Sequence, residues 1–303
     1  MRVIIAGGSG LIGRRLIVEL LQARLEVIVI SRRPENVRKI FSAVRAEFWD
    51  AKASNVLVNI FDGADAVINL IGESIAAKRW SSTQKQKILS SRIDSTRAIV
   101  NAIEQTVRRP SVLLNASAVG YYGHVPEGEV TEEYPKGNGF LPDVCEQWEM
   151  EAQKAQEFGV RVVLLRTGIV LDKNEGALHK LLFPFRMFVG GPLGNGRQWF
   201  PWIHVQDEVN AILYAMEHEQ IASAINLFAP ESVRLSDFCN VLGKVLHRPS
   251  WLPVPEFTLR LMLGEMAEPL LFQGQKIIPA KLLEAGFQFR YPNLENALQD
   301  ILR

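Results

Sequence analysis

The chain has 303 residues, of which 48% are hydrophobic, and its 34 basic and 33 acidic side chains give a formal net charge of +1. This balance argues against a nucleic-acid binder whose affinity rests on neutralising phosphates, and we find no apolar run of the roughly 18 residues that a membrane span needs. Cys145 and Cys239 lie far apart without metal-ligand spacing, so we expect reduced thiols and no metal site. Glycines from Gly7 onward interrupt the apolar N-terminus too early for a signal peptide, which predicts a cytoplasmic protein.

Apolar runs along the first half of the chain predict strands that alternate with helices. Buried strands are predicted at 3–6, 26–30, 66–71, 111–116 and 161–165. Apolar residues at helical spacing predict helices over 11–21, 83–105 and 144–157. This alternation predicts an α/β fold, a Rossmann-type doubly wound parallel sheet.

The composition changes after about residue 172. A glycine-rich stretch at 190–196 is followed by helix-like segments at 207–218 and 236–247, then by a proline-rich linker and a last segment, 257–303. We therefore expect residues 1–172 to form an NADP-binding Rossmann domain. Residues 173–303 should form a small C-terminal α/β lobe for substrate, interleaved with the main domain.

The glycines Gly7, Gly10 and Gly13 have GxxGxxG spacing between the first strand and the first helix. The first permits a tight turn, the second lets the backbone approach a pyrophosphate, and the third lets helix and strand pack closely. The free amides and positive dipole end of the helix would then face the phosphates. We expect this loop to bind a dinucleotide, with contacts from Ser9, Leu11 and Ile12 as well.

Ser31, Arg32 and Arg33 stand at the end of the second strand, where an NAD site has an acidic residue for the ribose hydroxyls. A guanidinium can instead hold a 2′-phosphate through two parallel hydrogen bonds, and the serine hydroxyl can donate to it. The sequence therefore favours NADP(H) over NAD. The alternative is that the two arginines are a solvated surface pair.

Further cofactor contacts are expected at the carboxyl ends of the other strands, because ligands bind at that edge of a doubly wound sheet. The predicted contacts are Leu70, Ile71, Gly72, Glu73, Ser117 and Val170. Asp50 follows a third strand and is either an acceptor for the adenine amino group or a plain turn residue.

Several motifs occur in order along the whole chain, residues 1–303. They include the loop at 7–13, Asn69–Glu73, Ser117–Gly123, Trp148-Glu149, Leu165–Val170, Gly190–Gln198 and Trp202–His204. Together they resemble the short-chain dehydrogenase/reductase superfamily of extended type, and more closely its atypical epimerase family. The resemblance implies a Rossmann fold, NADP(H) binding, a C-terminal substrate lobe and a physiological substrate that is largely unassigned.

Arg92 is placed by this resemblance at the start of the helix that faces the active site. There it could reach the cofactor phosphates or a substrate anion. The alternative is an exposed helix arginine that pairs with Asp94 or another neighbour.

Active members of the superfamily use a Tyr-x-x-x-Lys pair in which the tyrosine transfers a proton. The resemblance places Leu141 and Cys145 at these two positions, so the usual acid is missing. Ser117 holds the place of the serine that polarises the substrate, and Tyr121 or Tyr122 could serve as acid. The alternatives are that Ser117 caps a strand, that both rings only wall the pocket, and that Cys145 is a buried apolar side chain instead of a nucleophile.

Substrate contacts are expected on or near the glycine-rich loop. The candidates are Arg197 and Gln198, with Arg186 nearby and His204 further along. An arginine there suits a phosphate or carboxylate, although His204 more often makes a satisfied core hydrogen bond. Trp199, Phe200 and Trp202 either stack on a planar group or join the core of the lobe.

Two functions remain open from the sequence. The first is an NADP-dependent oxidoreductase or epimerase that acts on a small or nucleotide-linked substrate by an altered proton transfer. The second is a non-catalytic NADP(H)-binding sensor or scaffold, a class that fits the cell-division-inhibitor label of some relatives. In both cases we expect a small-molecule ligand, no nucleic acid or membrane partner, and a monomer or homodimer.

Overall fold

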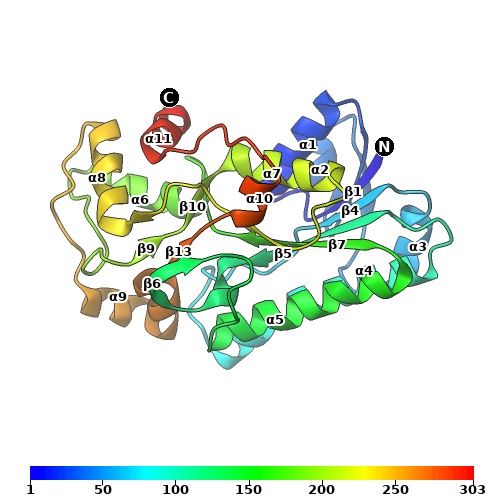
Figure 1. The fold of residues 1–303 in the computed structure, drawn as a ribbon, viewed down its shortest axis with the longest axis horizontal. Helices are drawn as coiled ribbons and strands as arrows, with labels where there is room; N and C mark the ends of the chain where they lie inside the picture. Colours follow the sequence, from blue (N-terminus) through cyan, green and yellow to red (C-terminus); the bar gives the residue numbers. More distant parts are fainter.

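A parallel sheet of seven strands forms the centre of the computed structural model, which describes residues 1–303 (Figure 1). The strand order is β11-β7-β5-β4-β1-β2-β3. The strands are β1 (Arg2–Ala6), β2 (Glu26–Ser31), β3 (Arg45–Phe48), β4 (Ala66–Asn69), β5 (Val112–Ala118), β7 (Arg161–Thr167) and β11 (Ser223–Leu227). The order reverses between β1 and β4, which is the switch point at which a doubly wound sheet binds ligands. The predicted Rossmann-type fold is confirmed.

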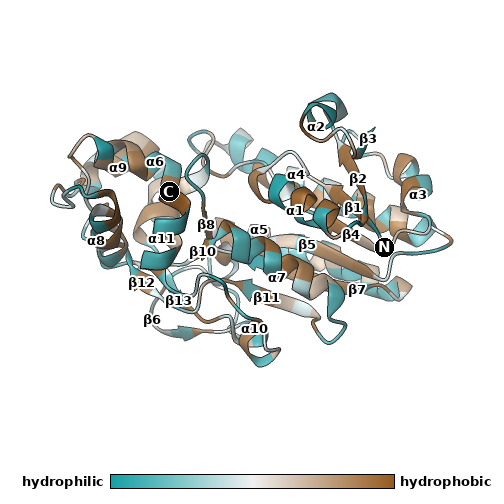
Figure 2. Cartoon of the chain, turned by 90° about the horizontal axis from the view of Figure 1, so that it is seen from above, coloured by the Kyte–Doolittle hydropathy of each residue, from teal (hydrophilic) through white to brown (hydrophobic).

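Helices cover both faces of the sheet. One face carries α1 (Leu11–Gln22), α2 (Pro34–Ile40) and α7 (Val205–Glu217). The other carries α3 (Asn55–Phe61), α4 (Ser82–Gln105) and α5 (Phe140–Gln153). In Figure 2 the central strands are largely hydrophobic while the helices show both colours, since each helix buries only one stripe.

The C-terminal lobe has a core of its own but shares elements with the main domain. Its helices are α6 (Gly176–Arg186), α8 (Leu235–Leu246), α9 (Glu256–Leu263) and α11 (Leu294–Leu302). The helix α10 (Ala280–Glu284) follows α9 in the chain but packs Leu282 into the core of the main domain. Short strands join it: β6 (Val125–Val130), β8 (Ile169–Leu171), β9 (Trp199–Phe200), β10 (Trp202–His204), β12 (Val233–Arg234) and β13 (Gln275–Ile277). Both α7 and β11 come from the second half of the chain yet pack in the main domain. None of the helices is long and apolar enough to span a bilayer.

Most element boundaries shift by one or two residues from the sequence prediction, and the strand at 66–71 and the helix from 144 have local causes that can be named. The predicted strand at 66–71 ends as β4 at Asn69, although the Leu70 amide still donates to the Ala6 carbonyl oxygen of β1. The next amide, that of Ile71, donates to the side-chain oxygen of Asn69 at 3.2 Å and so takes no part in the sheet. The helix predicted from residue 144 begins at Phe140. Gly139 turns the chain with a φ of +117°, and Pro142 is tolerated because the first helical turn needs no amide donor there.

Candidate functional site

The glycine loop between β1 and α1 has the geometry of a phosphate cradle. Gly7 adopts a φ of +91°. A Cβ on Gly13 would lie 2.6 Å from the carbonyl oxygen of Gly7, so only glycine lets helix and loop approach this closely. Gly10 is the N-cap of α1 and offers no capping side chain, which leaves the first amides of the helix free for an anion.

The end of β2 presents two free guanidinium groups. Arg32 and Arg33 are exposed, and neither side chain hydrogen-bonds or pairs with another protein group. Ser31 accepts a hydrogen bond from the Arg33 amide at 3.1 Å, which orders the turn. Asp50 lies further along, and its carboxylate accepts from the amides of Lys52 and Ala53 at 2.9 and 3.0 Å. Those bonds give Asp50 the role of a turn residue.

Arg92 of α4 is turned inward against the loop after β4. Its Nη1 donates to the carbonyl oxygens of Glu73 and Ile88 at 3.0 and 2.9 Å. Its guanidinium lies 5.0 Å from the ring centre of Trp148 and packs on Gly72, whose Cβ, if present, would be 3.0 Å from Cζ. Arg92 is therefore not the exposed helix arginine paired with Asp94 that the sequence left as an alternative.

A cavity of about 620 Å³ opens beside Arg92, between the carboxyl ends of β5 and β7 and the C-terminal lobe. Ala118, Val119 and Gly120 form one wall and Thr167 to Ile169 form another. Residues of α5, α6, β9 and the 264–275 segment complete it. This is the edge of the sheet at which the sequence predicted cofactor and substrate to meet.

Leu141 and Cys145 both face this cavity. A Cβ on Gly120 would lie 3.1 Å from the Leu141 Cβ and 3.5 Å from the Cys145 sulfur, so both side chains pack on the loop after β5. Burial raises the pKa of the Cys145 thiol to about 12. The thiol is therefore protonated at neutral pH and fills space, because the thiolate is the reactive form.

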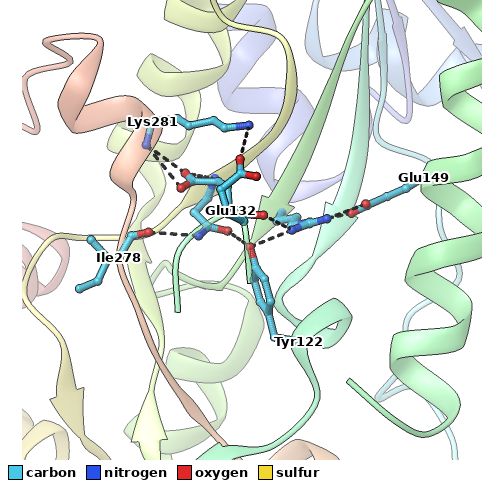
Figure 3. Close-up of polar contacts among 8 residues, drawn as sticks. Tyr122, Glu132, Glu149, Ile278 and Lys281 are labelled. Carbon is cyan, nitrogen blue, oxygen red and sulfur yellow. Dashed lines mark hydrogen bonds and ion pairs between the residues drawn. The ribbon is translucent and has the colours of Figure 1, made fainter. Parts of the chain in front are cut away.

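A buried polar network occupies the interior behind this loop (Figure 3). Arg166 of β7 donates from Nε and Nη2 to the two carboxylate oxygens of Glu149, each at 2.9 Å. Its Nη1 donates to the Tyr122 hydroxyl and to the Glu132 carbonyl oxygen at 3.0 and 3.1 Å. The Tyr122 hydroxyl donates to the Asn226 side chain at 2.6 Å. The network connects α5, β7 and β11.

The Glu132 carboxylate extends the network to the C-terminal segment. It accepts from the amides of Asn226 and Lys281 at 3.0 and 3.3 Å. The Asn226 side chain in turn donates to the Ile278 carbonyl oxygen at 3.1 Å. In Figure 3, Ile278 and Lys281 lie on the side of the network opposite Glu149, and of the two only Lys281 contacts Glu132.

The network also holds the side chains predicted to be catalytic. Ser117 is buried and its hydroxyl donates to Glu149 at 2.6 Å. Burial raises the pKa of Tyr122 to about 12, although the Arg166 guanidinium acts in the opposite direction. Tyr121 lies with its ring centre 3.5 Å from the Arg166 guanidinium. None of the three lines the cavity, so the structure does not bring these predicted catalytic groups to its wall.

The predicted substrate residues separate in space. Gln198 lines the cavity, as do Trp199 and Phe200. Arg197 lies in an adjoining hollow of about 500 Å³ that shares Gln198 and Trp199 with the cavity. Exposed Arg186 and the buried Trp202 line neither space.

His204 is a structural residue at the N-terminus of α7. Its Nδ1 accepts from the Gln206 amide at 3.0 Å, and its ring stacks on Tyr291 with centres 3.9 Å apart. It lies outside the cavity wall because these contacts hold it in the core, the alternative that the sequence left open. Asp207 likewise anchors the C-terminal segment through the Arg290 and Tyr291 amides.

Sequence reasoning assigned no role to Arg166, Glu132, Asn226 and Glu208. The available signal was Arg166 directly after the apolar run predicted at 161–165, since a charge at the end of a buried strand needs a partner. Glu149 belongs to the Trp148-Glu149 motif, but nothing in the spacing of that motif predicts that Glu149 pairs with Arg166.

The comparisons with known proteins decide the family. The model described as "NAD dependent epimerase/dehydratase family" matches residues 3–227. The chain belongs to this family. Residues 254–301 match a domain of unknown function, DUF1731. The resemblance predicted from the motifs is confirmed.

Relatives of this epimerase-family chain match it over its whole length. An "Epimerase family protein SDR39U1 homolog, chloroplastic" of Arabidopsis thaliana is 42% identical and covers 100% of the chain and 87% of its own length. "Epimerase family protein YfhF" of Bacillus subtilis is 38% identical, covering 100% and 98%. The crystal structure of human epimerase family protein SDR39U1 (isoform 2) with NADPH has a TM-score of 0.89 at 31% identity, covering 99% of each chain.

Proposed function

We propose that this epimerase-family protein binds NADP(H), with the diphosphate on the Gly7–Gly13 loop and the adenosine 2′-phosphate at Ser31, Arg32 and Arg33. The observation that carries the proposal is the pair of guanidinium groups at the end of β2 that have no protein partner. Support comes from the free amides at the start of α1 and from the human relative, whose structure contains NADPH.

The remaining cofactor contacts follow from the same placement. We assign the nicotinamide end to the carboxyl ends of β4, β5 and β7, so that it faces the cavity. The proposed contacts there are Leu70, Ile71, Gly72, Glu73, Ser117 and Val170. On the glycine loop, Ser9, Leu11 and Ile12 contact the diphosphate. Arg92 reaches the cofactor phosphates or a substrate anion. Residues 1–172 then hold the cofactor and 173–303 close the substrate side, in a cytoplasmic monomer or homodimer.

The proposed activity is that of an oxidoreductase or epimerase with an atypical proton transfer. Bound NADPH supplies a hydride. The chain supplies a cavity shielded by apolar side chains, while Leu141 cannot exchange a proton. Any reduction here therefore takes its proton from water or from another group.

A second candidate function is a non-catalytic NADP(H) sensor or scaffold. It is favoured by the hydrogen bonds that commit the Ser117 hydroxyl to Glu149 and the Tyr122 hydroxyl to Asn226. A panel of carbonyl compounds, followed by NADPH oxidation, separates the two functions. Turnover supports the enzyme, and tight NADPH binding without turnover supports the sensor.

Cofactor choice is tested by titrating NADPH and NADH into the full chain. We expect NADPH to bind more tightly, and Arg32→Ala and Arg33→Ala to weaken NADPH about tenfold or more, the size of a lost charged hydrogen bond. NADH affinity should change little. Lys39→Ala, which removes an exposed cation of α2, is the matched control. Equal affinity of the unmutated chain for both cofactors would refute the proposal.

A further inference from the structure

The cavity is lined mainly by hydrocarbon. Its apolar side chains include Trp80, Leu141, Leu181, Phe200 and Leu270, contributed by separate elements around the opening. Apolar walls favour ligands that bring apolar surface out of water. The walls therefore select against a ligand that is covered with hydroxyl groups.

Most polar groups of the cavity wall are already engaged with the protein. The Thr167 hydroxyl donates to Glu208 at 2.8 Å. The Gln198 side chain donates to the carbonyl oxygens of Leu193 and Leu271 at 3.1 and 2.6 Å. Gln275 donates to the Gly123 carbonyl oxygen. A sugar ring needs several free donors and acceptors, and these side chains do not provide them.

Two carboxylates of the cavity wall form ion pairs, and two further polar side chains are exposed. Glu265 pairs with Lys85 and Glu268 with Arg260. Asn138 and Lys180 are exposed. Gln273 is half-buried and its side chain makes no hydrogen bond, so the free hydrogen-bonding side chains in the interior of the wall are Arg92 and Gln273.

Arg92 carries a positive charge and forms no ion pair with a carboxylate, although the charge of nearby Glu73 acts on it. Its hydrogen bonds use Nη1 and two backbone carbonyls, which leaves Nε and Nη2 available. Burial lowers the pKa of Arg92, a sign that its charge is incompletely compensated. A guanidinium in such surroundings gains most from a carboxylate, which it can bind through two hydrogen bonds.

We propose that the cavity binds a mostly apolar molecule that carries one carboxylate, with the carboxylate at Arg92, and not a nucleotide-linked sugar. The proposal deepens the proposed function and rests on it, because the cavity adjoins the strand ends to which we assign the nicotinamide. A nucleotide-linked sugar would instead use the polar hollow at Arg197, where Arg234 stacks on Trp199 at 3.6 Å.

The experiment titrates 2-naphthoate, its neutral analogue 2-naphthamide and UDP-glucose calorimetrically into the full chain saturated with NADPH. We expect 2-naphthoate to bind most tightly. Arg92→Gln should weaken 2-naphthoate at least tenfold and change 2-naphthamide less than threefold, while Arg92→Lys keeps part of the naphthoate affinity. Unchanged 2-naphthamide binding also shows that the variant is folded.

Leu261→Ser is the matched control for adventitious binding to apolar surface. Leu261 lies on α9 with 76% of its surface exposed and outside the cavity wall, so this variant should bind both naphthalene probes unchanged. Tighter binding of UDP-glucose, lost in Arg197→Ala, overturns the proposal. So does an equal loss of both naphthalene probes in Arg92→Gln when the variant keeps its melting temperature.

The two proposals fail in different ways. If NADPH does not bind but the free chain binds 2-naphthoate in an Arg92-dependent manner, the cofactor assignment falls and the ligand assignment stands. If NADPH binds and 2-naphthoate does not, the ligand assignment falls alone.

Discussion

Replacing Glu208 by glutamine should stabilise the protein at neutral and alkaline pH. Glu208 lies in α7 with no exposed surface, and one carboxyl oxygen accepts from the Thr167 hydroxyl at 2.8 Å. The other oxygen, Oε2, is buried without a hydrogen-bond partner, and no cation lies beside the group. Burial therefore raises the pKa of Glu208 from 4.5 to about 8.

The sign and size of the effect follow from proton linkage. Between pH 4.5 and about 8 the folded chain keeps a proton on Glu208 that the unfolded chain has released, so stability falls as pH rises through this range. At about 1.4 kcal/mol per pKa unit, the loss is ~1 kcal/mol at pH 5 and ~3 kcal/mol at pH 7. Glutamine imitates the protonated acid and still accepts from Thr167.

Urea unfolding at pH 5, 7 and 8.5 measures this difference. Glu208→Gln should gain little at pH 5 and a few kcal/mol at pH 7 and above. Glu217→Gln, an exposed glutamate of the same helix, is the control and should show no such trend. A stability difference between Glu208→Gln and the unmutated chain that does not change with pH would refute the reasoning.

Three further predictions concern the glycine loop, the buried His204 and the Cys145 thiol. Gly10→Ala should fold normally, since its Cβ would make only a 3.5 Å contact with Gly7, but it should lose NADPH binding. Gly13→Ala should lose thermal stability. Normal NADPH affinity in a folded Gly10→Ala variant would exclude the loop as the binding site. Burial lowers the pKa of His204 to about 4. The unfolded chain therefore binds a proton that the folded chain does not, and the free energy of unfolding falls by about 2 kcal/mol between pH 7 and 5. His204→Asn, which keeps a capping side chain, should abolish this part of the fall, as measured by urea unfolding. Cys145 should resist iodoacetamide at pH 8 until the chain unfolds; rapid labelling of the native protein, read by mass spectrometry, would contradict its burial.

The sequence predicted the central sheet because its signals are local. Apolar runs, helical spacing and the glycine spacing at 7–13 each depend on residues within one element or its neighbour. The resemblance to the superfamily, which rests on such local motifs, implied that Leu141 and Cys145 stand at the positions of the usual tyrosine and lysine. The structure places both at the cavity.

The polar interior could not be predicted in this way. Glu149 and Arg166 are paired across elements 17 positions apart, and Glu132 meets the Lys281 amide 149 positions away. No periodicity encodes such contacts, because they depend on how elements pack. The sequence placed the Ser117 hydroxyl beside a cofactor. The packing of the elements instead brings Glu149 to it, and the hydroxyl donates to that carboxylate.

The sequence by itself determined a dinucleotide loop, basic side chains at the end of β2 and the loss of the usual acid. Only the tertiary structure decided which side chains surround the cavity at the carboxyl ends of β5 and β7. The segment at 264–275 returns from the C-terminal lobe to close an apolar cavity over Arg92, and His204 is held in the core instead of at substrate. The chemical character of each side chain follows from the sequence, whereas the shape and charge of a cavity depend on segments that meet only when the chain has folded.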